Sequence, residues 1–434
     1  MRWLELYKSK QVDANTAIEV IQSGQRLYLT GNAAVPKVLL AALVRRAPML
    51  ENVEIVQALT IGSADYVEPE MQGHLRVNTL FISDTLRPAV QDGRADFTPV
   101  FLSEVPLLFA RDVLPLDVAL CHVSPPDEHG FCSLGIEAGL SKTAAQKARI
   151  VIAEVNDKMP RTLGDSFIHL SKINFAVPVS YTPSELQLGE PNELSLQIAA
   201  HIAELIEDGS TLQTGIGAIP DAVLHYLRSK KDLGIHTELF SDGVVALVEA
   251  GVINNEKKTL HPGKIVAGIA LGTRRLYEFV DDNPIVEFHP QEYINDPFVI
   301  AQNNKMVAIN SAIEVDLTGQ VCADSIGPRF YSGVGGQVDF IYGASRSKGG
   351  KPIIALPSTS VLRDGRRVSR IAAMLQTGAG VTTSRNHVHY VVTEYGVAWL
   401  YGKTIRQRAQ ALIAIAHPDF REALEKQARE LRYL

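Results

Sequence analysis

The stretch RLYLTGNAAVPKVLLAALVRRAPMLENVEIVQAL, residues 26–59, decides the fold class. Its two ends, 26–31 and 52–59, are short apolar runs of the kind that form buried parallel strands. Between them Pro36 precedes KVLLAALVRRA, in which apolar residues recur at helical spacing, and proline suits the first turn of a helix. The strand–helix–strand order predicts a β-α-β unit and therefore an α/β fold.

The same alternation continues outward from this unit. Further apolar runs at 116–123 and 148–155 predict two more buried strands. Residues 178–191 then carry three prolines and a glycine, which disfavour both helix and strand ladder. We therefore predict an N-terminal α/β domain over 1–180, a linker over 181–191 and a C-terminal α/β domain over 192–434.

The C-terminal half begins with the clearest helix signal in the chain. Asn192 can cap a helix whose apolar residues line one face, and Gly209 can end it. The pattern then alternates again, with a glycine turn at 215–217, a helix near 219–228, several apolar β-rich runs and a charged helix from 418 onward. No repeat at the level of residues relates the two halves.

Composition limits the classes of function. The 434 residues include 46% hydrophobic and 21% charged residues, as in ordinary globular proteins. The formal net charge is −6, so the surface offers no overall positive field for nucleic acid or an anionic membrane, and an anionic ligand must be held locally.

Cysteine usage and the N-terminal segment bear on the compartment. The three cysteines, Cys121, Cys132 and Cys322, are too few for a disulfide framework and lack metal-ligand spacing, so we expect small core residues. Charges interrupt each apolar stretch of the N-terminal segment, and no uncharged apolar run approaches the roughly 20 residues of a membrane span. We expect a soluble cytoplasmic protein.

Three glycine clusters stand out at 213–217, 332–336 and 376–380. Glycine lets backbone N–H groups approach a ligand or point together at an oxyanion or a phosphate. None of the clusters is a complete GxGxxG motif or a Walker loop, so dinucleotide and nucleotide cofactors are disfavoured. For each cluster alone, a tight packing turn remains an equal alternative. Basic residues near the second and third clusters could meet phosphates or could be solvated.

The segment GIHTELFSDG, residues 234–243, carries the most reactive-looking side chains. Strand alternation would place His236, Glu238 and Phe240 on one face. A carboxylate on a mostly buried strand is costly unless it is paired or used. By itself, however, Glu238 is more simply a salt-bridged residue, and His236 is more simply structural than a metal ligand.

Taken together, eight segments resemble the class I coenzyme A transferases, in particular the acetyl-CoA hydrolase/transferase family, over nearly the whole chain. These segments are VSPPDEHGFCSLG (123–135), VNDKMPRTLGDS (155–166), QTGIGAIPDAV (213–223), HTELFSDGV (236–244), HPQEYIND (289–296), INSAIEVDLTGQV (309–321), SGVGGQVDF (332–340) and VTEYGVAWLYGKT (392–404). The resemblance implies two open α/β domains with the active site in the cleft between them, and a homodimer.

The resemblance also implies roles for individual residues. Glu238 matches the catalytic glutamate, which attacks an acyl-CoA thioester and passes through a glutamyl-CoA thioester in ping-pong catalysis. Gly336 is implied as the oxyanion donor, and Asn295 as a residue near the glutamate. The remaining implied positions contact coenzyme A: Gln213, Thr214, Gly215, Ile216, Gly217, Asn310, Ser332, Gly333, Gly335 and Lys348.

The function that follows from the resemblance is transfer of coenzyme A from an acyl-CoA to a short-chain carboxylate, with 4-hydroxybutyrate favoured. One thioester replaces another, so no metal or nucleotide cofactor is expected. Two alternatives stay open: an acyl-CoA hydrolase, in which water resolves the glutamyl intermediate, and a catalytically silent acyl-CoA-binding protein. A dinucleotide-dependent oxidoreductase is a more distant alternative.

Overall fold

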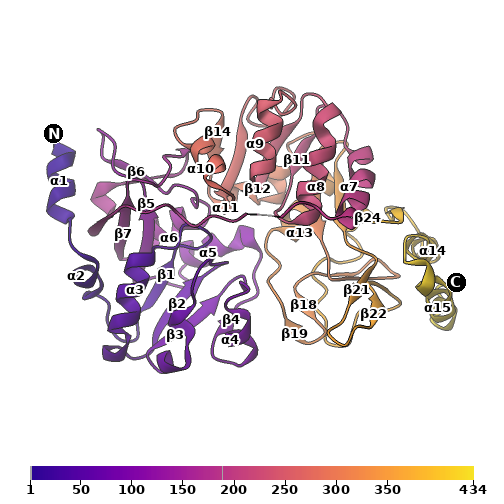
Figure 1. Ribbon diagram of the computed structural model, residues 1–434, viewed down its shortest axis with the longest axis horizontal. Helices are drawn as coiled ribbons and strands as arrows, with labels where there is room; N and C mark the ends of the chain where they lie inside the picture. Colours follow the sequence, from indigo (N-terminus) through magenta and orange to yellow (C-terminus); the bar gives the residue numbers. More distant parts are fainter. Residues whose placement is uncertain (1, 188) are drawn as a thin grey trace. The chain divides into compact units, whose positions relative to one another are not determined.

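The computed structural model describes residues 2–187 and 189–434 and divides into two compact units (Figure 1). Unit 1 comprises residues 1–187, 238–242 and 266–294, and unit 2 comprises the remaining segments, 188–237, 243–265 and 295–434. The predicted domains were continuous segments, whereas the chain returns twice to unit 1 after leaving it.

Unit 1 is built on a parallel sheet with the order β10-β7-β5-β1-β2-β3-β4. Its strands are β1 (Arg26–Leu29), β2 (Val53–Gln57), β3 (Leu75–Thr79), β4 (Asp96–Phe97), β5 (Val118–Val123), β7 (Ile150–Asn156) and β10 (Phe175–Val179). From β1 the chain first adds strands on one side and then, from β5 onward, on the other. The switch point of the sheet therefore lies between β1 and β5, where ligands bind in open α/β sheets, at the carboxyl ends of the strands.

The predicted β-α-β unit is confirmed, with α3 (Lys37–Arg46) connecting β1 to β2 beside the sheet (Figure 1). The other α-helices of unit 1 are α1 (Arg2–Lys10), α2 (Ala14–Ile18), α4 (Arg87–Gln91), α5 (Val105–Ala110), α6 (Ser141–Lys147), α10 (Arg274–Val280) and α11 (Gln291–Ile294). Short strands complete it: β6 (Phe131–Ser133) pairs with β9 (Phe167–His169), and β13 (Ile265–Ala270), β14 (Val286–Phe288) and β8 (Leu163–Gly164) follow one another in order. Apolar residues of β1, β2, β3, α2 and α3 form its core.

Unit 2 repeats this architecture with the strand order β25-β24-β20-β15-β11-β12. The strands are β11 (Thr211–Gln213), β12 (Gly234–Phe240, of which residues 238–240 are counted in unit 1), β15 (Met306–Ser311), β20 (Lys351–Ala355), β24 (Tyr390–Thr393) and β25 (Gly396–Trp399). In this series only β25 is antiparallel to its neighbour. The switch point lies between β11 and β15, because β12 is added on one side of β11 and β15 on the other. The predicted α/β class is thus confirmed in both halves.

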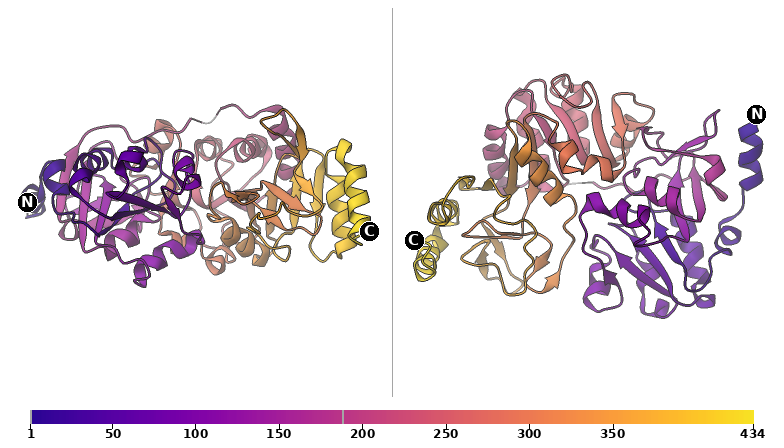
Figure 2. Two further views of the ribbon diagram at one scale, coloured as in Figure 1. Left: turned by 90° about the horizontal axis from the view of Figure 1, so that it is seen from below. Right: turned by 180° about the vertical axis from the view of Figure 1, so that it is seen from behind.

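Helices and small β-hairpins complete unit 2. The α-helices are α7 (Glu193–Leu205), α8 (Ala218–Tyr226), α9 (Asp242–Glu249), α12 (Pro297–Ile300), α13 (Gln337–Arg346), α14 (Ile405–Ala414) and α15 (Pro418–Glu430). The short strands are β16 (Glu314–Asp316), β17 (Val321–Cys322), β18 (Ser325–Ile326), β19 (Arg329–Phe330), β21 (Thr359–Val361), β22 (Arg367–Ser369) and β23 (Ile371–Ala372). Figure 2 shows α14 and α15 side by side at the C-terminus, where their apolar residues join a second core.

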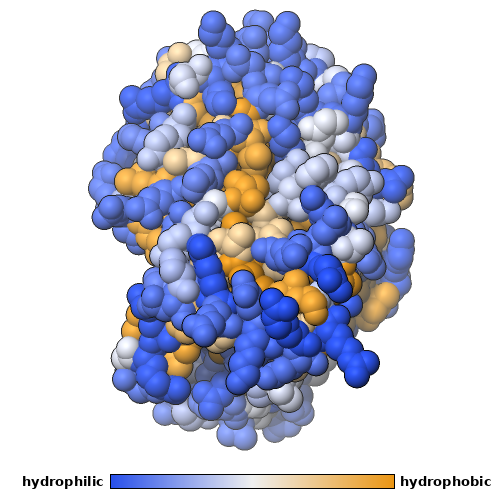
Figure 3. Space-filling view, turned by 90° about the vertical axis from the view of Figure 1, so that its right-hand side faces the viewer, coloured by the Kyte–Doolittle hydropathy of each residue, from blue (hydrophilic) through white to orange (hydrophobic). Residues whose placement is uncertain are grey.

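Figure 3 shows one face on which apolar side chains gather near the middle and hydrophilic side chains surround them. Within the described part of the chain, no helix combines the length and the apolar character that crossing a membrane requires. All three cysteines are buried and free, as predicted for core residues.

Candidate active site

Two of the predicted coenzyme A contacts meet at the switch point of unit 2. Gln213 ends β11 and Asn310 lies near the end of the neighbouring β15. The Gln213 Oε1 atom accepts hydrogen bonds from Asn310 Nδ2 at 3.1 Å and from the backbone N–H of Ile309 at 3.0 Å. The two side chains therefore form one polar cluster at the carboxyl edge of the sheet, where open α/β folds bind ligands. We call this edge the switch edge of unit 2.

The first glycine cluster forms the loop that leaves β11 at the switch edge and leads into α8. Gly217 has a φ of 118° and precedes the first residue of α8, a conformation that glycine adopts without steric cost. The N-cap residue Gly217 has no side chain with which to cap this helix. Thr214 is fully buried, and its Oγ1 has no hydrogen-bond partner among the described residues. The loop thus offers backbone donors and a buried hydroxyl.

Glu238 lies on β12 directly after the point where this strand is fixed to the loop. The Thr237 hydroxyl donates to the Thr214 carbonyl at 2.9 Å, and both residues are fully buried. Glu238 itself is half-buried, between the buried residues Thr237 and Leu239. Its position in β12 is therefore set by main chain and by a neighbouring hydroxyl. His236 is fully buried, with its ring centroid 6.2 Å from that of Phe340, which fits the structural role predicted for it.

Lys258 supports the same strand and was not predicted from the sequence. Its Nζ donates to the carbonyl of Ile235 at 2.8 Å and to that of Lys264 at 2.7 Å, and the residue is 4% exposed. Its methylene groups fill the space beside Gly234, where a Cβ atom would lie 2.4 Å from Lys258 Cγ. A buried lysine that binds backbone carbonyl groups has no sequence signature, because these acceptors depend on the tertiary fold.

The second glycine cluster precedes α13. Ser332 donates its backbone N–H to the Asp324 carbonyl at 3.2 Å, which anchors the start of the turn. Gly335 has a φ of 56°, and Gly336 occupies the position before α13 without a side-chain cap. Gly333, between these points, has no regular secondary structure. The arrangement leaves backbone N–H groups at the start of a helix, the geometry that favours an anion or an oxyanion.

Asn295 is held by a residue of α13. Its Nδ2 donates to Asp339 Oδ2 at 3.3 Å, and both side chains are buried. Asp339 was not singled out from the sequence, although it belongs to the segment SGVGGQVDF that did carry the resemblance. Gln337 of the same segment donates from Nε2 to the Ser311 carbonyl at 2.7 Å and so connects α13 to the end of β15.

Lys348 lies apart from these groups. It is exposed in the turn before β20, and its carbonyl accepts from the N–H of Lys305, which precedes β15. Both positions are at the amino ends of the parallel strands, opposite to the carboxyl edge that carries Gln213. The structure therefore does not bring Lys348 to the switch edge.

The third glycine cluster and the basic residues near it have partners within the fold. Gln376 donates its N–H and its Nε2 to the two carboxylate oxygens of buried Glu314 at 2.8 and 2.9 Å. Arg366 pairs with Asp364, and Arg367 pairs with Asp419. These observations favour a packing turn and solvated ion pairs over a phosphate site at this place.

Two other segments of the resemblance lie in unit 1 and line one cavity of about 630 Å³ at the carboxyl ends of β5 and β7. Asp127 follows β5 and Arg161 follows β7; the guanidinium donates to the carboxylate at 2.9 Å and stacks on the Phe167 ring at 4.6 Å. Hydrogen bonds hold the pKa of Asp127 below its usual value despite desolvation. The two segments are thus tied together beside this cavity.

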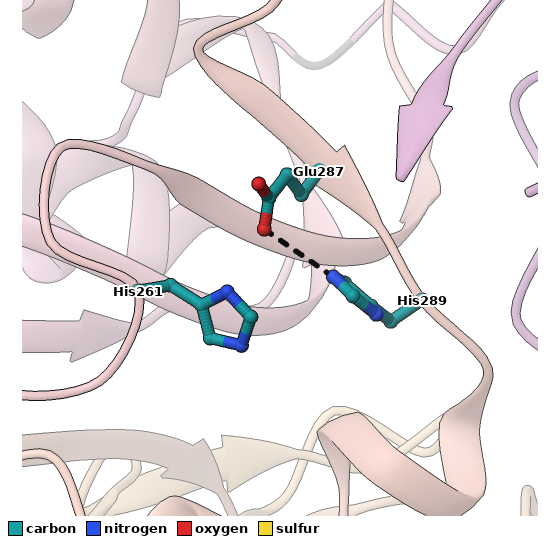
Figure 4. A group of neighbouring side chains, drawn as sticks. All are labelled: His261, Glu287 and His289. Atoms are coloured by element: carbon teal, nitrogen blue, oxygen red, sulfur yellow. Dashed lines mark hydrogen bonds and ion pairs between the residues drawn. The ribbon is translucent and has the colours of Figure 1, made fainter. Parts of the chain in front are cut away.

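A histidine and a carboxylate with the chemistry of metal ligands lie at the end of β14. His289 Nε2 and Glu287 Oε2 are 3.4 Å apart (Figure 4). This pair supplies two ligand atoms within unit 1, whereas zinc sites in proteins use three or four protein ligands. His261, also drawn in Figure 4, belongs to unit 2.

Comparison with protein families matches most of the chain to two models. The N-terminal domain model of acetyl-CoA hydrolase/transferase matches residues 2–185, and the C-terminal domain model of the same family matches residues 272–428. The chain belongs to the acetyl-CoA hydrolase/transferase family. The predicted resemblance is confirmed, and the chain is an enzyme of the CoA-transferase type.

Individual relatives of this family cover nearly the whole chain. The 4-hydroxybutyrate coenzyme A transferase of Clostridium kluyveri is 55% identical and matches 98% of each chain. A succinyl-CoA:acetate/propanoyl-CoA:succinate CoA transferase of Fasciola hepatica is 50% identical over 94% of this chain and 85% of its own. The crystal structure of 4-hydroxybutyrate CoA-transferase from Porphyromonas gingivalis is 43% identical, with a TM-score of 0.85 over 99% of this chain and 100% of that one.

Proposed function

We propose that the chain transfers coenzyme A from an acyl-CoA such as acetyl-CoA to 4-hydroxybutyrate or a similar short-chain carboxylate, with Glu238 as the nucleophile. The observation that carries the proposal is the place of Glu238, one residue beyond the hydrogen bond that joins Thr237 to the loop at the switch edge of unit 2. The 55% identity to a 4-hydroxybutyrate coenzyme A transferase supports the choice of acceptor.

The chemistry needs only a carboxylate and hydrogen-bond donors. A carboxylate oxygen of Glu238 attacks the thioester carbonyl, the C–S bond breaks, and coenzyme A leaves as a thiolate, which gives an acyl-glutamyl anhydride. The thiolate then attacks the glutamyl carbonyl of the anhydride and its C–O bond breaks. The first acid leaves as its carboxylate, and a glutamyl-CoA thioester remains on the enzyme. The acceptor carboxylate reverses both steps, so the cycle consumes neither water nor a net proton.

Each step passes through a tetrahedral intermediate with negative charge on oxygen. Backbone N–H groups that are already in place stabilise such an oxyanion best, because they need no reorganisation. Gly336, at the start of α13, is the donor that we assign to this role, and we assign Asn295, which donates to Asp339, to the same step. The loop at 213–217, Asn310 and the turn at 332–335 are assigned to coenzyme A. The contact between Lys348 and coenzyme A stays a prediction from the sequence, because Lys348 lies at the opposite edge of the sheet.

A trapping experiment tests the covalent step. The protein is incubated with acetyl-CoA alone and reduced with borohydride, and the modified peptide is mapped. We expect the label within 236–243 of the wild type and no label in Glu238→Gln, whose amide is not nucleophilic. A label at another residue, or wild-type turnover in Glu238→Gln, would contradict the assignment.

An exchange assay with a panel of carboxylates tests the acceptor. Formation of 4-hydroxybutyryl-CoA from acetyl-CoA supports the proposal, and the ranking of 4-hydroxybutyrate against acetate, propionate, butyrate and succinate identifies the preferred acid. Release of free coenzyme A without a new thioester would instead identify a hydrolase. Binding without either product would identify a silent acyl-CoA-binding protein.

A further inference from the structure

The loop that leaves β1 at the switch point of unit 1, residues 30–36, is tightly fixed. Gly31 has no room for a side chain, because a Cβ atom there would lie 2.2 Å from the Ala58 carbonyl oxygen. Asn32 donates its N–H to the Leu59 carbonyl at 2.5 Å and accepts from Ile61 N–H at 3.2 Å. These contacts tie the loop after β1 to the loop after β2.

Asn32 also holds an unusual conformation at this place. Its φ is 52°, which asparagine tolerates better than most residues, and it is 3% exposed. Its Oδ1 has no hydrogen-bond partner among the residues that the structure describes. A buried polar atom of this kind costs free energy unless a ligand or water satisfies it. The loop therefore has the position and the polar group of a ligand-binding loop.

The start of α3, directly after this loop, is capped from a distant strand. The residue before α3 is Pro36, which provides no side-chain cap. Instead Glu154 of β7, which is fully buried, accepts the N–H of Leu39 on Oε1 at 2.6 Å. Its Oε2 accepts the hydroxyl of Tyr181. A carboxylate is favourable at a helix N-terminus, where N–H groups lack acceptors and the helix dipole is positive.

A second contact from the same sheet holds the end of the loop. His122 of β5 lies opposite Glu154 in the strand register. Its Nδ1–H donates to the Ala34 carbonyl at 3.2 Å, and its Nε2 accepts from Asn156 at 3.0 Å. This pattern requires the neutral ring, and burial lowers the pKa of His122 to about 3. Asn156 also donates to the Tyr181 carbonyl at 2.7 Å, which closes the network.

We infer that Glu154 is a positioning residue for coenzyme A transfer: its buried carboxylate fixes the start of α3 and thereby the 30–36 loop at the ligand-binding edge of unit 1. The inference rests on the proposed function for the reaction that the loop serves. Glu154 does not touch reacting atoms in this assignment, and its effect passes through Leu39 and the loop.

The groups that face Glu154 determine its response to pH. They are Tyr181 from the segment after β10, Lys37 from α3 and His122 from β5. Desolvation raises the pKa of Glu154 to about 6, although hydrogen bonds from Tyr181 and from the start of α3 lower it in part. The carboxylate is therefore ionised at pH 7.5 and becomes protonated below about pH 6, which weakens the helix cap.

The test compares Glu154→Gln, which keeps the shape of the side chain and removes its charge, with wild type. We expect amide hydrogen exchange in peptides covering 30–41 to be about tenfold faster, the factor that loss of one charge-assisted hydrogen bond corresponds to. We expect kcat/KM for the carboxylate acceptor to fall by a similar factor. In the wild type, kcat/KM plotted against pH should fall on the acidic side with a midpoint near pH 6. Glu154→Gln should lack this acidic limb.

Glu137→Gln is the matched control. Glu137 is equally buried in unit 1 and likewise accepts a backbone N–H, that of Leu140 at 3.0 Å, at the start of α6. This variant should keep wild-type exchange in 37–41, the start of α3. Thr30 is left out of the comparison because its hydroxyl contacts Ser141, which donates to Glu137. Tyr181→Phe, the second variant, removes a hydrogen bond that lowers the pKa of Glu154, so the limb should move to higher pH.

Three outcomes would overturn the inference. The first is unchanged hydrogen exchange in 30–41 in a folded Glu154→Gln variant. The second is that Glu137→Gln shows the same losses as Glu154→Gln. The third applies if Glu154→Gln does not fold, and it is a Tyr181→Phe variant with an unmoved acidic limb and unchanged exchange. If the wild type transfers coenzyme A to no carboxylate, the proposed function fails. Hydrogen exchange, which needs no substrate, still decides whether Glu154 holds the loop.

Discussion

At the scale of single residues, Gln213 holds the switch edge of unit 2 together. Its buried Oε1 accepts from both Ile309 N–H and Asn310 Nδ2. We expect Gln213→Ala to lower the free energy of unfolding by about 1–3 kcal/mol, because a buried N–H loses its acceptor. Urea unfolding measures the change.

The matched control for this prediction is Gln302→Ala. Gln302 donates from its amide to the Phe298 carbonyl at 3.1 Å, but it does so at an exposed position. We expect a change below about 0.5 kcal/mol there, as for ordinary surface substitutions. Equal losses in the two variants would mean that Gln213 contributes no more than a surface glutamine.

Glu137 gives the fold a predictable dependence on pH. Burial raises the pKa of this carboxyl to about 7 in the folded protein, from an ordinary value of 4.5, so the folded state binds more protons than the unfolded state. The free energy of unfolding must then fall as pH rises from about 4.5 to above 7, by about 3 kcal/mol for this group.

The variant Glu137→Gln cannot titrate and should lose most of this slope. Its amide can still accept from Leu140 N–H and can donate to the hydroxyls of Ser141 and Tyr28, which contact Glu137 in the wild type. Unfolding by urea at pH 5 and pH 8 measures the effect. If the free energy of unfolding of the variant falls between pH 5 and pH 8 by as much as that of the wild type, groups other than Glu137 cause the pH dependence.

At the scale of elements, α7 shows a helix whose start is encoded locally. Asn192 has extended backbone angles, and its Oδ1 accepts the N–H of Ser195 at 2.8 Å, as the sequence pattern predicts. We expect Asn192→Ala to destabilise unit 2 by about 1 kcal/mol. Asn192→Asp should keep the wild-type midpoint in urea, because aspartate caps equally well; a loss in both variants would contradict the capping role.

Comparison of α7 with α3 shows how far the sequence alone predicts this fold. Strands at 26–31, 52–59, 116–123 and 148–155 are found within two residues of their predicted bounds, since apolar runs and prolines act locally. The cap of α3 lies 115 residues away, at Glu154, and the hydrogen bond between Gln213 and Asn310 spans 97 residues. No local pattern encodes such pairs.

The residues of the candidate site also fall into those that the sequence reveals and those that only the fold reveals. Glycine turns and Glu238 are visible in sequence because they belong to short segments with a family resemblance. Their neighbours Lys258 and Asp339 become meaningful only when the strands and helices are in place. Lys348 lies in a turn beside Lys305, because the chain enters β20 at the amino end of the sheet. Spacing along the chain does not show at which sheet edge a turn lies.

At the scale of the whole molecule, the family resemblance predicts a homodimer. A chain of 47.4 kDa then gives a symmetric particle of roughly 95 kDa, the commonest closed assembly. Mass photometry at nanomolar concentration measures this directly. A single species at the mass of one chain would contradict the prediction.

Buried thiols have a consequence for the chemistry of this enzyme. Coenzyme A is itself a thiol, and its oxidised forms exchange with protein thiolates. Here Cys121, Cys132 and Cys322 are all at most 1% exposed, and desolvation raises the pKa of the first two to about 12. At neutral pH fewer than about one in 10⁴ of those two thiols is ionised. Burial therefore keeps the three thiols of the folded protein away from coenzyme A disulfide.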